Sequence, residues 1–318
     1  MSLEGTAWAV AAPRTSLEEL RPLVRAHERR RPVHVHVLAD GGPLDPGLLR
    51  ELAGGAAGLL VVGHRRRSPR TALPGPFVAD PDGRLVPVSW LPAVAGGLGS
   101  FARAAARVAG RAGDRVGPLA VLGQWEPRYL HLATRMERRL NGRAGPVRAL
   151  RWTAERITRD DLVRGLRYGI GAAIYFGHGR PTGWAAYHGL RAHHLTEHAG
   201  EPLGALLSVT CLTASRWNTG LAFSEAVALG GAAAGAVGAV APVEHLENMR
   251  WMLGLAAALR AGETLLGPAL LRAAPGPPRA AEPYRILGDP LAQLVGAPAA
   301  ERRARAVFAP APEVPAWT

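Results

Sequence analysis

Short apolar runs alternate with amphipathic segments along most of the chain, a pattern typical of strands followed by helices. The apolar runs predict strands at 32–40, 56–64, 116–125, 146–153, 171–179, 201–211 and 232–243. The amphipathic segments predict helices at 45–55, 100–113, 128–142, 158–169, 221–231 and 247–262. Residues 65–97 are rich in Pro and Gly and predict irregular structure.

Most of the predicted strands are apolar throughout, which is typical of a parallel sheet covered on both faces. The sequence therefore predicts the α/β class, as a three-layer αβα sandwich with a mainly parallel sheet. A faint repeat suggests two halves, because GLLVVGHRRRSP (58–69) resembles GAAIYFGHGRPTG (171–183) in its strand, Gly-His and Arg. The segment 296–318 is rich in Ala, Pro and Arg, and we expect a disordered tail there.

Composition fits a folded protein, with 48% hydrophobic and 20% charged residues among 318. The formal net charge is +13, and every basic residue other than His is Arg. All-Arg usage beside abundant Ala, Gly and Pro indicates a GC-rich genome more than selection for charge. The arginines are scattered, and the densest run, GHRRRSPR (63–70), has no stacking aromatics between its charges. We expect no specific nucleic-acid partner.

Location is predicted from three features of the sequence. Cys211 is the single cysteine, so no disulfide forms within the chain. The first twenty residues show no basic start before a long apolar core, so we expect no signal peptide. The uncharged run 226–243 is long enough to span a membrane, but its Ala and Gly content favours a helix end followed by a buried strand. We therefore expect a cytoplasmic protein without membrane insertion.

Two chemically active side chains follow predicted strands. In IYFGHGRPTGW (174–184), an apolar strand ends in Gly-His-Gly at His178. In LLSVTC (206–211), another ends at Cys211. In an open α/β sheet, ligands bind beyond the carboxyl ends of the strands. If these two strands are neighbours, the imidazole and the thiol share one edge of the sheet, the arrangement of a cysteine nucleophile with a histidine partner.

The neighbouring glycines suit that chemistry. A free thiol has a pKa of about 8.5, and a nearby imidazole assists formation of the reactive thiolate. Gly179 lets a backbone N–H approach a substrate carbonyl, and with the N–H of Cys211 it would form an oxyanion hole. Gly177 permits a sharp exit from the strand. Alternatively, neither residue is catalytic: Cys211 is a small apolar side chain buried in the core, and His178 only forms hydrogen bonds at the end of its strand.

Four segments resemble, in order, those of the gingipain-type (C25) peptidases and the related CHAT domains, which belong to the caspase-like cysteine peptidases. They are IYFGHGRPTGW, LLSVTCLTA, the run 223–243 and YRILGDPLAQL (284–294), and the resemblance covers about residues 117–294. It implies a caspase/gingipain-like fold and a Cys-His endopeptidase with His178 and Cys211 as its dyad. The domain prediction is then a non-catalytic α/β half at 1–113 and a caspase-like catalytic domain at 114–295.

The resemblance also implies an S1 pocket that recognises one substrate side chain, commonly Arg, Lys or Asp. Glu126, in VLGQWEPRYL, matches the segment that supplies an acidic S1 residue in gingipain-type enzymes. Asp40 is a second acid, predicted at the same sheet edge, and either could pair bidentately with a substrate Arg. Trp251 resembles a pocket-wall tryptophan. Glu126 and Asp40 could equally well be solvent-exposed acids in loops. Trp251 could equally well be a core residue of an amphipathic helix. We favour a basic P1 residue.

Related compact bacterial peptidases serve in regulated self-defence, so the resemblance suggests a defence protease that cleaves a partner such as a gasdermin-like pore former. Two alternatives stay open: a catalytically inactive CHAT-like binding scaffold, and a basic nucleic-acid-binding α/β protein. His188, His193, His194 and His198 cluster between the dyad residues, but their loose spacing does not favour a zinc site. We expect no cofactor and no catalytic metal.

Overall fold

The computed structural model describes residues 7–42, 44–94, 96–111, 117–142, 147–197, 200–274 and 280–296. Its strands are β1 (Ala7–Ala12), β2 (Val33–Val37), β3 (Ala56–His64), β4 (Phe77–Ala79), β5 (Leu85–Ala93), β6 (Leu119–Gly123), β7 (Ala149–Thr153), β8 (Ala172–Phe176), β9 (Gly179–Arg180), β10 (Gly183–Trp184), β11 (Leu203–Val209), β12 (Ala233–Ala239) and β13 (Tyr284–Gly288). The predicted tail lies outside the described residues, apart from Gly296.

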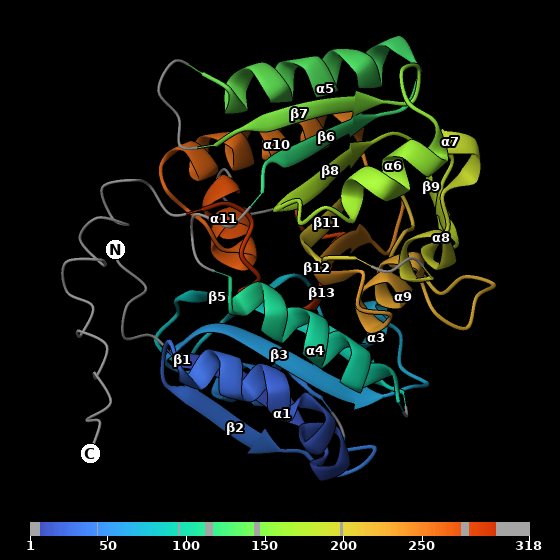
Figure 1. Cartoon of the computed structure of the whole chain (residues 1–318). Helices are drawn as coiled ribbons and strands as arrows, with labels where there is room; N and C mark the ends of the chain where they lie inside the picture. Colours follow the sequence, from blue (N-terminus) through green and yellow to red (C-terminus); the bar gives the residue numbers. More distant parts are fainter. Residues whose placement is uncertain are drawn as a thin grey trace, which may run out of the picture.

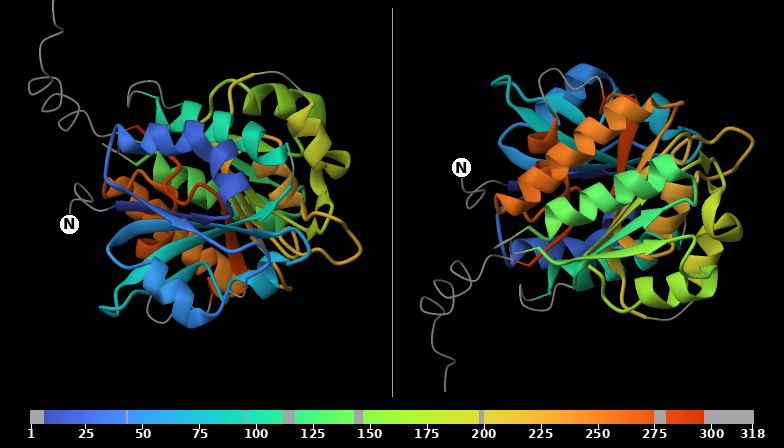
Figure 2. Two further views of the ribbon diagram at one scale, coloured as in Figure 1. Left: turned by 90° about the horizontal axis from the view of Figure 1, so that it is seen from below. Right: turned by 90° about the horizontal axis from the view of Figure 1, so that it is seen from above.

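Helices connect most of these strands (Figure 1). They are α1 (Arg14–Glu28), α2 (Pro46–Leu52), α3 (Pro69–Ala72), α4 (Gly97–Ala109), α5 (Pro127–Leu140), α6 (Arg159–Leu166), α7 (Ala186–Gly189), α8 (Ala192–Thr196), α9 (Phe223–Leu229), α10 (His245–Arg260) and α11 (Leu266–Ala273). α1, α4 and α9 pack together on one face of the central sheet, and α5, α10 and α11 pack on the other (Figure 2).

The central sheet has eleven strands, in the order β2-β1-β3-β5-β13-β12-β11-β8-β6-β7, with β4 paired to β5 beside this path. Its neighbours are parallel except for two pairs, β12 with β13 and β4 with β5. The predicted α/β class and mainly parallel sheet are therefore confirmed. The apolar strands are buried along their lengths, as β8 and β11 illustrate, because helices cover both faces.

β13 occupies the middle of the sheet, although it is the last strand in the part of the chain that the structure describes. It pairs parallel with β5 and antiparallel with β12, so it joins the strands of the N-terminal part to those that follow. The division at residue 113 stays a prediction, since a single hydrogen-bonded sheet runs through both parts.

The sequence prediction was wrong for residues 65–97. This segment contains α3, β4 and β5, and β5 lies inside the sheet between β3 and β13. Pro87 and Pro92 suggested a break because proline lacks a backbone N–H for the ladder. The prediction also missed β1, whose sequence AWAVAA is rich in Ala, a residue with low strand preference. α1, α11 and β13 were missed as well.

Candidate active site

The two predicted strands are parallel neighbours in the sheet. β8 pairs with β11 in a register that sets Phe176 opposite Val209. His178 follows Phe176 by two residues, and Cys211 follows Val209 by two residues. The fold therefore brings the imidazole and the thiol to the same level beyond adjacent strands, where the side chains of both residues line one cavity.

The glycines around His178 are required by close packing. A Cβ on Gly177 would collide with the hydroxyl of Tyr175, and a Cβ on Gly179 would lie 2.5 Å from the carbonyl oxygen of Cys211. Real Cβ atoms do not approach other atoms so closely, and the atom facing Gly179 belongs to rigid backbone. The absence of a side chain at 179 thus lets the chain after β8 approach the chain after β11.

We expect Gly179→Ala to reduce peptide cleavage by about 100-fold, because separating the two chain segments by about 1 Å misplaces the reacting groups. Gly220→Ala is a matched control, since Gly220 lies in the loop after Cys211 and a Cβ there would have open space around it. Steady-state kinetics with both variants checks this expectation. Equal kcat values for Gly179→Ala and the unsubstituted protein would show that the close packing has no catalytic role.

His178 is half exposed, and its position is held by residues at the end of β6 and the start of α5. Its backbone N–H donates to Oε1 of Gln124 at 2.7 Å. Its Nε2 lies 3.0 Å from Oε1 of Glu126 and 3.0 Å from Nη2 of Arg128. The ring edge packs against the ring of Tyr129, with centroids 5.4 Å apart. In the described part of the chain, Nδ1 has no hydrogen-bond partner, so that nitrogen remains available for chemistry.

Cys211 is partly exposed, and its Sγ accepts a hydrogen bond of 3.4 Å from the backbone N–H of Val243. The next residue, Leu212, has a φ of 63°, a left-handed conformation that is rare for a branched side chain. Such strain is held in place by surrounding structure. Here the loop is anchored by Arg216, which pairs with the buried carboxylate of Glu225 and also donates to the carbonyl of Arg65 after β3.

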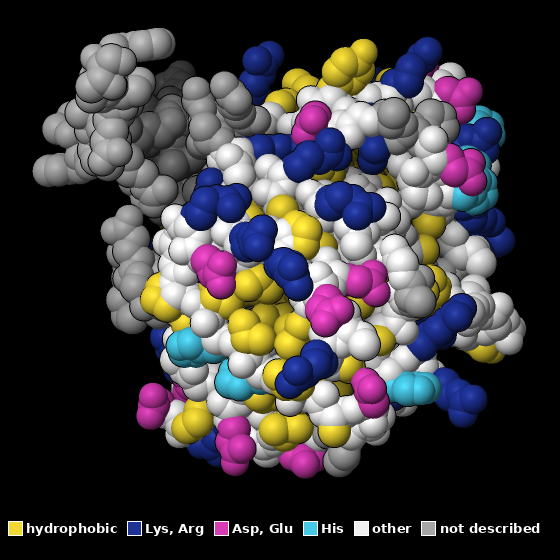
Figure 3. All heavy atoms as spheres, turned by 60° about the horizontal axis from the view of Figure 1, so that its bottom comes forward, with side chains coloured by type: hydrophobic (Ala, Val, Ile, Leu, Met, Phe, Trp, Pro, Cys, Tyr) yellow, Lys and Arg dark blue, Asp and Glu magenta, His cyan; other side chains and the backbone are white. Residues whose placement is uncertain are grey.

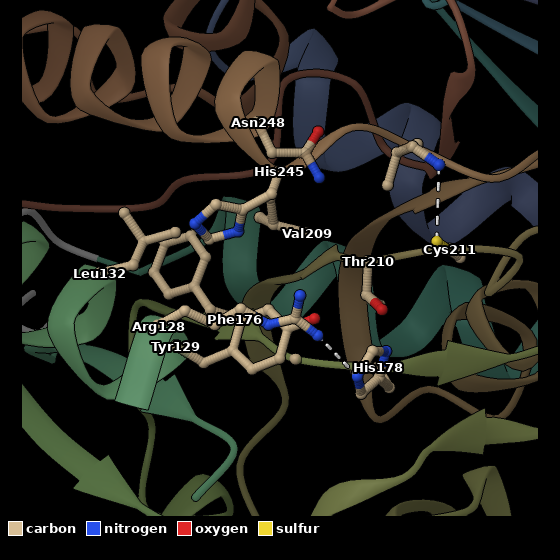
Figure 4. Close-up of a pocket in the computed structure, with 12 residues that line it drawn as sticks. Arg128, Tyr129, Leu132, Phe176, His178, Val209, Thr210, Cys211, His245 and Asn248 are labelled. Atoms are coloured by element: carbon tan, nitrogen blue, oxygen red, sulfur yellow. Dashed lines mark hydrogen bonds between the residues drawn. The ribbon is translucent and has the colours of Figure 1, made fainter. Parts of the chain in front are cut away.

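The cavity beside the thiol and the imidazole has a volume of about 230 Å³ (Figure 4). It is lined by the ends of β8 and β11, the first two turns of α5, and the start of α10 with the residue Val243 before it. Its walls are partly apolar and partly polar, and the lining residues are Arg128, Tyr129, Leu132, Phe176, Gly177, His178, Val209, Thr210, Cys211, Val243, His245 and Asn248. A side chain of a bound peptide could therefore enter next to Cys211.

The predicted S1 residues lie in three different places. Glu126 is outside the cavity lining, where it contacts Arg128 at 3.0 Å as well as His178. Trp251 is fully buried in the core, where its Nε1 donates to the carbonyl of Leu270. Asp40 follows β2, the outermost strand, which is six positions from β11 in the sheet order (Figure 1). Of these three residues, the structure therefore brings only Glu126 into contact with His178.

Sequence reasoning missed several residues of this site. Three of them are neighbours of Glu126 in the sequence: Gln124, Arg128 and Tyr129. Two more lie in the first turn of α10, the helix that follows the glycine-rich strand β12: His245 and Asn248. Only their position in the fold could have predicted them, since each of these segments follows the carboxyl end of a strand that neighbours β8 or β11 in the sheet.

The structure adds little to the metal and membrane questions. Among the described residues, no group of three or more His, Cys, Asp and Glu side chains could hold a metal ion. The rings of His193 and His194 lie with centroids 4.1 Å apart and are tilted by 57°, whereas His198 lies outside the described residues. Within the described part of the chain, every helix is too short or too polar to cross a bilayer. On the face seen in Figure 3, Arg side chains are interspersed with Asp and Glu.

The fold and the comparisons with known proteins define a cysteine peptidase of the gingipain/caspase-like type. The model of peptidase family C25 matches residues 133–295, just over half of the chain, and the chain belongs to this family. Comparison with curated protein sequences finds no match.

Solved structures share the fold at low sequence identity. The Arg-specific cysteine proteinase gingipain R matches with a TM-score of 0.70 and 13% identity, over 93% of this chain and 79% of that one. The complex of Porphyromonas gingivalis RgpB pro- and mature domains gives a TM-score of 0.66 and 13% identity, over 92% and 80%. Separase from Saccharomyces cerevisiae, solved with securin, gives a TM-score of 0.51 and 12% identity, over 74% and 15%. The two gingipain likenesses cover more than nine-tenths of this chain and so extend into its N-terminal part.

Proposed function

We propose that Cys211 and His178 are the catalytic dyad of this cysteine endopeptidase. One observation supports the proposal: His178 and Cys211 each follow a paired position of the adjacent strands β8 and β11 by two residues, and both line one cavity. Family membership adds the chemistry, because a C25 peptidase needs a nucleophilic cysteine and the sequence contains only Cys211.

In the proposed reaction, His178 takes the thiol proton of Cys211, and the resulting thiolate attacks the scissile carbonyl carbon to form a tetrahedral intermediate. The backbone N–H groups of Gly179 and Cys211 stabilise its oxyanion. His178 transfers a proton to the leaving amine as the C–N bond breaks, which leaves a thioester on Cys211. Water then attacks the thioester with His178 as the base, which releases the acid product and restores the thiol.

Glu126 acts in this proposal as a positioning residue for His178. Its Oε1 lies 3.0 Å from Nε2, and Arg128 lies at the same distance from that nitrogen. A protonated Nε2 donates to Glu126, and an unprotonated one accepts from Arg128. Both arrangements fix the ring while leaving Nδ1 for the proton transfers. The role thus differs from the S1 role suggested by the sequence.

The biological setting is proposed from the family resemblance. It comprises a CHAT-related regulatory or antiviral defence role in the cytoplasm, with a gasdermin-like pore former as a protein substrate. The observations that support it are the peptidase family and the fold. A basic P1 preference had rested on Glu126 and Asp40, neither of which lines the cavity.

Thiol reactivity tests the dyad without knowledge of the substrate. We expect His178→Ala to slow the alkylation of Cys211 by iodoacetamide at pH 7 by about tenfold, because the imidazole assists thiolate formation. His131→Ala is the matched control, since that imidazole is exposed on α5 and does not line the cavity. Equal alkylation rates in both variants would overturn the dyad, and an inert thiol in the unsubstituted protein would favour the inactive scaffold.

A further inference from the structure

Among the described residues that line the cavity beside Cys211, none carries a carboxylate. Its charged or amide groups are Arg128, His245 and Asn248, together with the dyad imidazole. Glu126 lies outside this lining and faces Arg128 and His178. A substrate guanidinium or ammonium group that entered the cavity would therefore meet N–H donors and a like charge, without an acceptor carboxylate to replace its lost water.

Arg128 stands at the mouth of the cavity and is about half exposed. Its Cζ lies 4.6 Å from the centroid of the Tyr129 ring, so the guanidinium is held over an aromatic face. Its Nη2 contacts Glu126 and His178, each at 3.0 Å. A guanidinium carries five N–H donors in a planar fork. The donors of Arg128 that do not contact Glu126 or His178 could therefore bind an incoming carboxylate.

Asn248 presents a second donor from the opposite wall. Its side chain is buried, and its Oδ1 accepts a hydrogen bond of 2.9 Å from the hydroxyl of Tyr284. Burial raises the pKa of Tyr284 well above its usual value, so that hydroxyl stays protonated and donates. The amide oxygen is thereby occupied, and Figure 4 shows the amide nitrogen directed toward Val209 and the cavity.

We propose that this cavity is the S1 subsite and that it selects an acidic P1 side chain, Asp or Glu, through Arg128 and Asn248. The proposal rests on the dyad assignment above. The apolar walls formed by Leu132, Phe176 and Val209 would cover the methylene groups of such a side chain. The net charge of +13 adds a long-range attraction for acidic segments.

The first test compares peptidyl acyloxymethyl ketones that differ only at P1, namely Asp, Asn, Glu, Gln, Leu and Arg. Labelling of Cys211 is followed by mass spectrometry, so no natural substrate is needed. We expect the Asp or Glu probe to label faster than its isosteric amide by about 10- to 100-fold, the effect of a hydrogen bond to a charged group. Preference for the Arg probe, or equal rates for acid and amide, would overturn the acidic S1.

Arg128→Glu tests the residue assignment. We expect the order of the probes to invert, with the Arg probe labelling faster than the Glu probe, while the Leu probe reports any general loss through His178. Arg138→Glu is the matched control, because it makes the same charge change on the exposed side of α5. If Arg138→Glu changed the preference as much, or Arg128→Glu left it unaltered, the assignment would be wrong.

The same probes separate this inference from the dyad proposal. Labelling of Cys211 by the Arg probe in preference to the acidic ones would reject the acidic S1 and leave the dyad standing. Absence of labelling by every probe would reject the dyad proposal, and the S1 proposal with it.

Discussion

Replacing Cys211 with alanine is expected to reduce peptide-bond cleavage by about 10⁴-fold or more, because the substitution removes the only thiol and with it the covalent route to the thioester. The fold should survive, since Cys211 is partly exposed and its Sγ accepts a single weak hydrogen bond from Val243. Cleavage of a peptide library, read by mass spectrometry, measures the loss.

Ser215→Ala serves as the control for handling and folding, because Ser215 lies in the same loop and is not among the cavity residues. Thermal unfolding of both variants should give midpoints close to that of the unsubstituted protein. Undiminished cleavage by a clean Cys211→Ala preparation would remove the thiol from the mechanism. Loss of cleavage together with a large fall in Tm would instead indicate a structural role.

Glu225→Gln is expected to lower the free energy of unfolding by about 3–5 kcal/mol, the range for breaking one partner of a buried ion pair. The Glu225 carboxylate is fully buried and accepts two hydrogen bonds of 2.7 Å from Arg216, plus one of 2.9 Å from the backbone N–H of Ala222. The amide keeps the size of the side chain but leaves the Arg216 guanidinium without a counter-charge. Urea denaturation followed by circular dichroism measures the change.

The matched control is Glu247→Gln, which removes the same charge from an exposed pair with Arg250 on α10. Exposed pairs contribute little because water screens them, so we expect a change below about 1 kcal/mol. If both substitutions lowered the free energy of unfolding by similar amounts, the buried ion pair would contribute no more to stability than the exposed one. A partial loss of cleavage by Glu225→Gln is also expected, since Arg216 anchors the loop that begins at Cys211.

The meeting of His178 and Cys211 at one edge of the sheet could be predicted from the sequence, because each follows an apolar strand. Two apolar runs end in a histidine and a cysteine, and parallel strands place such ends together. The lining of the proposed S1 subsite could not be predicted, because Arg128 and Asn248 reach one cavity from α5 and α10, and the contact between these helices is set by tertiary packing. Glu126 was found for its charge, yet only the structure showed that the charge faces His178.

The fold class was likewise predictable, whereas the strand order was not. Local periodicity identifies an apolar strand but carries no information on its partners. Asp40 illustrates the consequence: it follows a strand near the front of the sequence, and β2 lies at the far edge of the sheet. The strand β5 was hidden by its prolines, although β3 pairs with it along six positions.

The central place of β13 has a consequence for how the molecule is made. Until residues 284–288 have left the ribosome, β5 and β12 each present an unpaired edge, and the two groups of strands have no strand to join them. Contacts between such distant parts of a chain form slowly, because a long loop must close before they are gained. The sheet therefore closes only after residues 284–288 have been synthesised, and the nascent protein carries exposed strand edges until then.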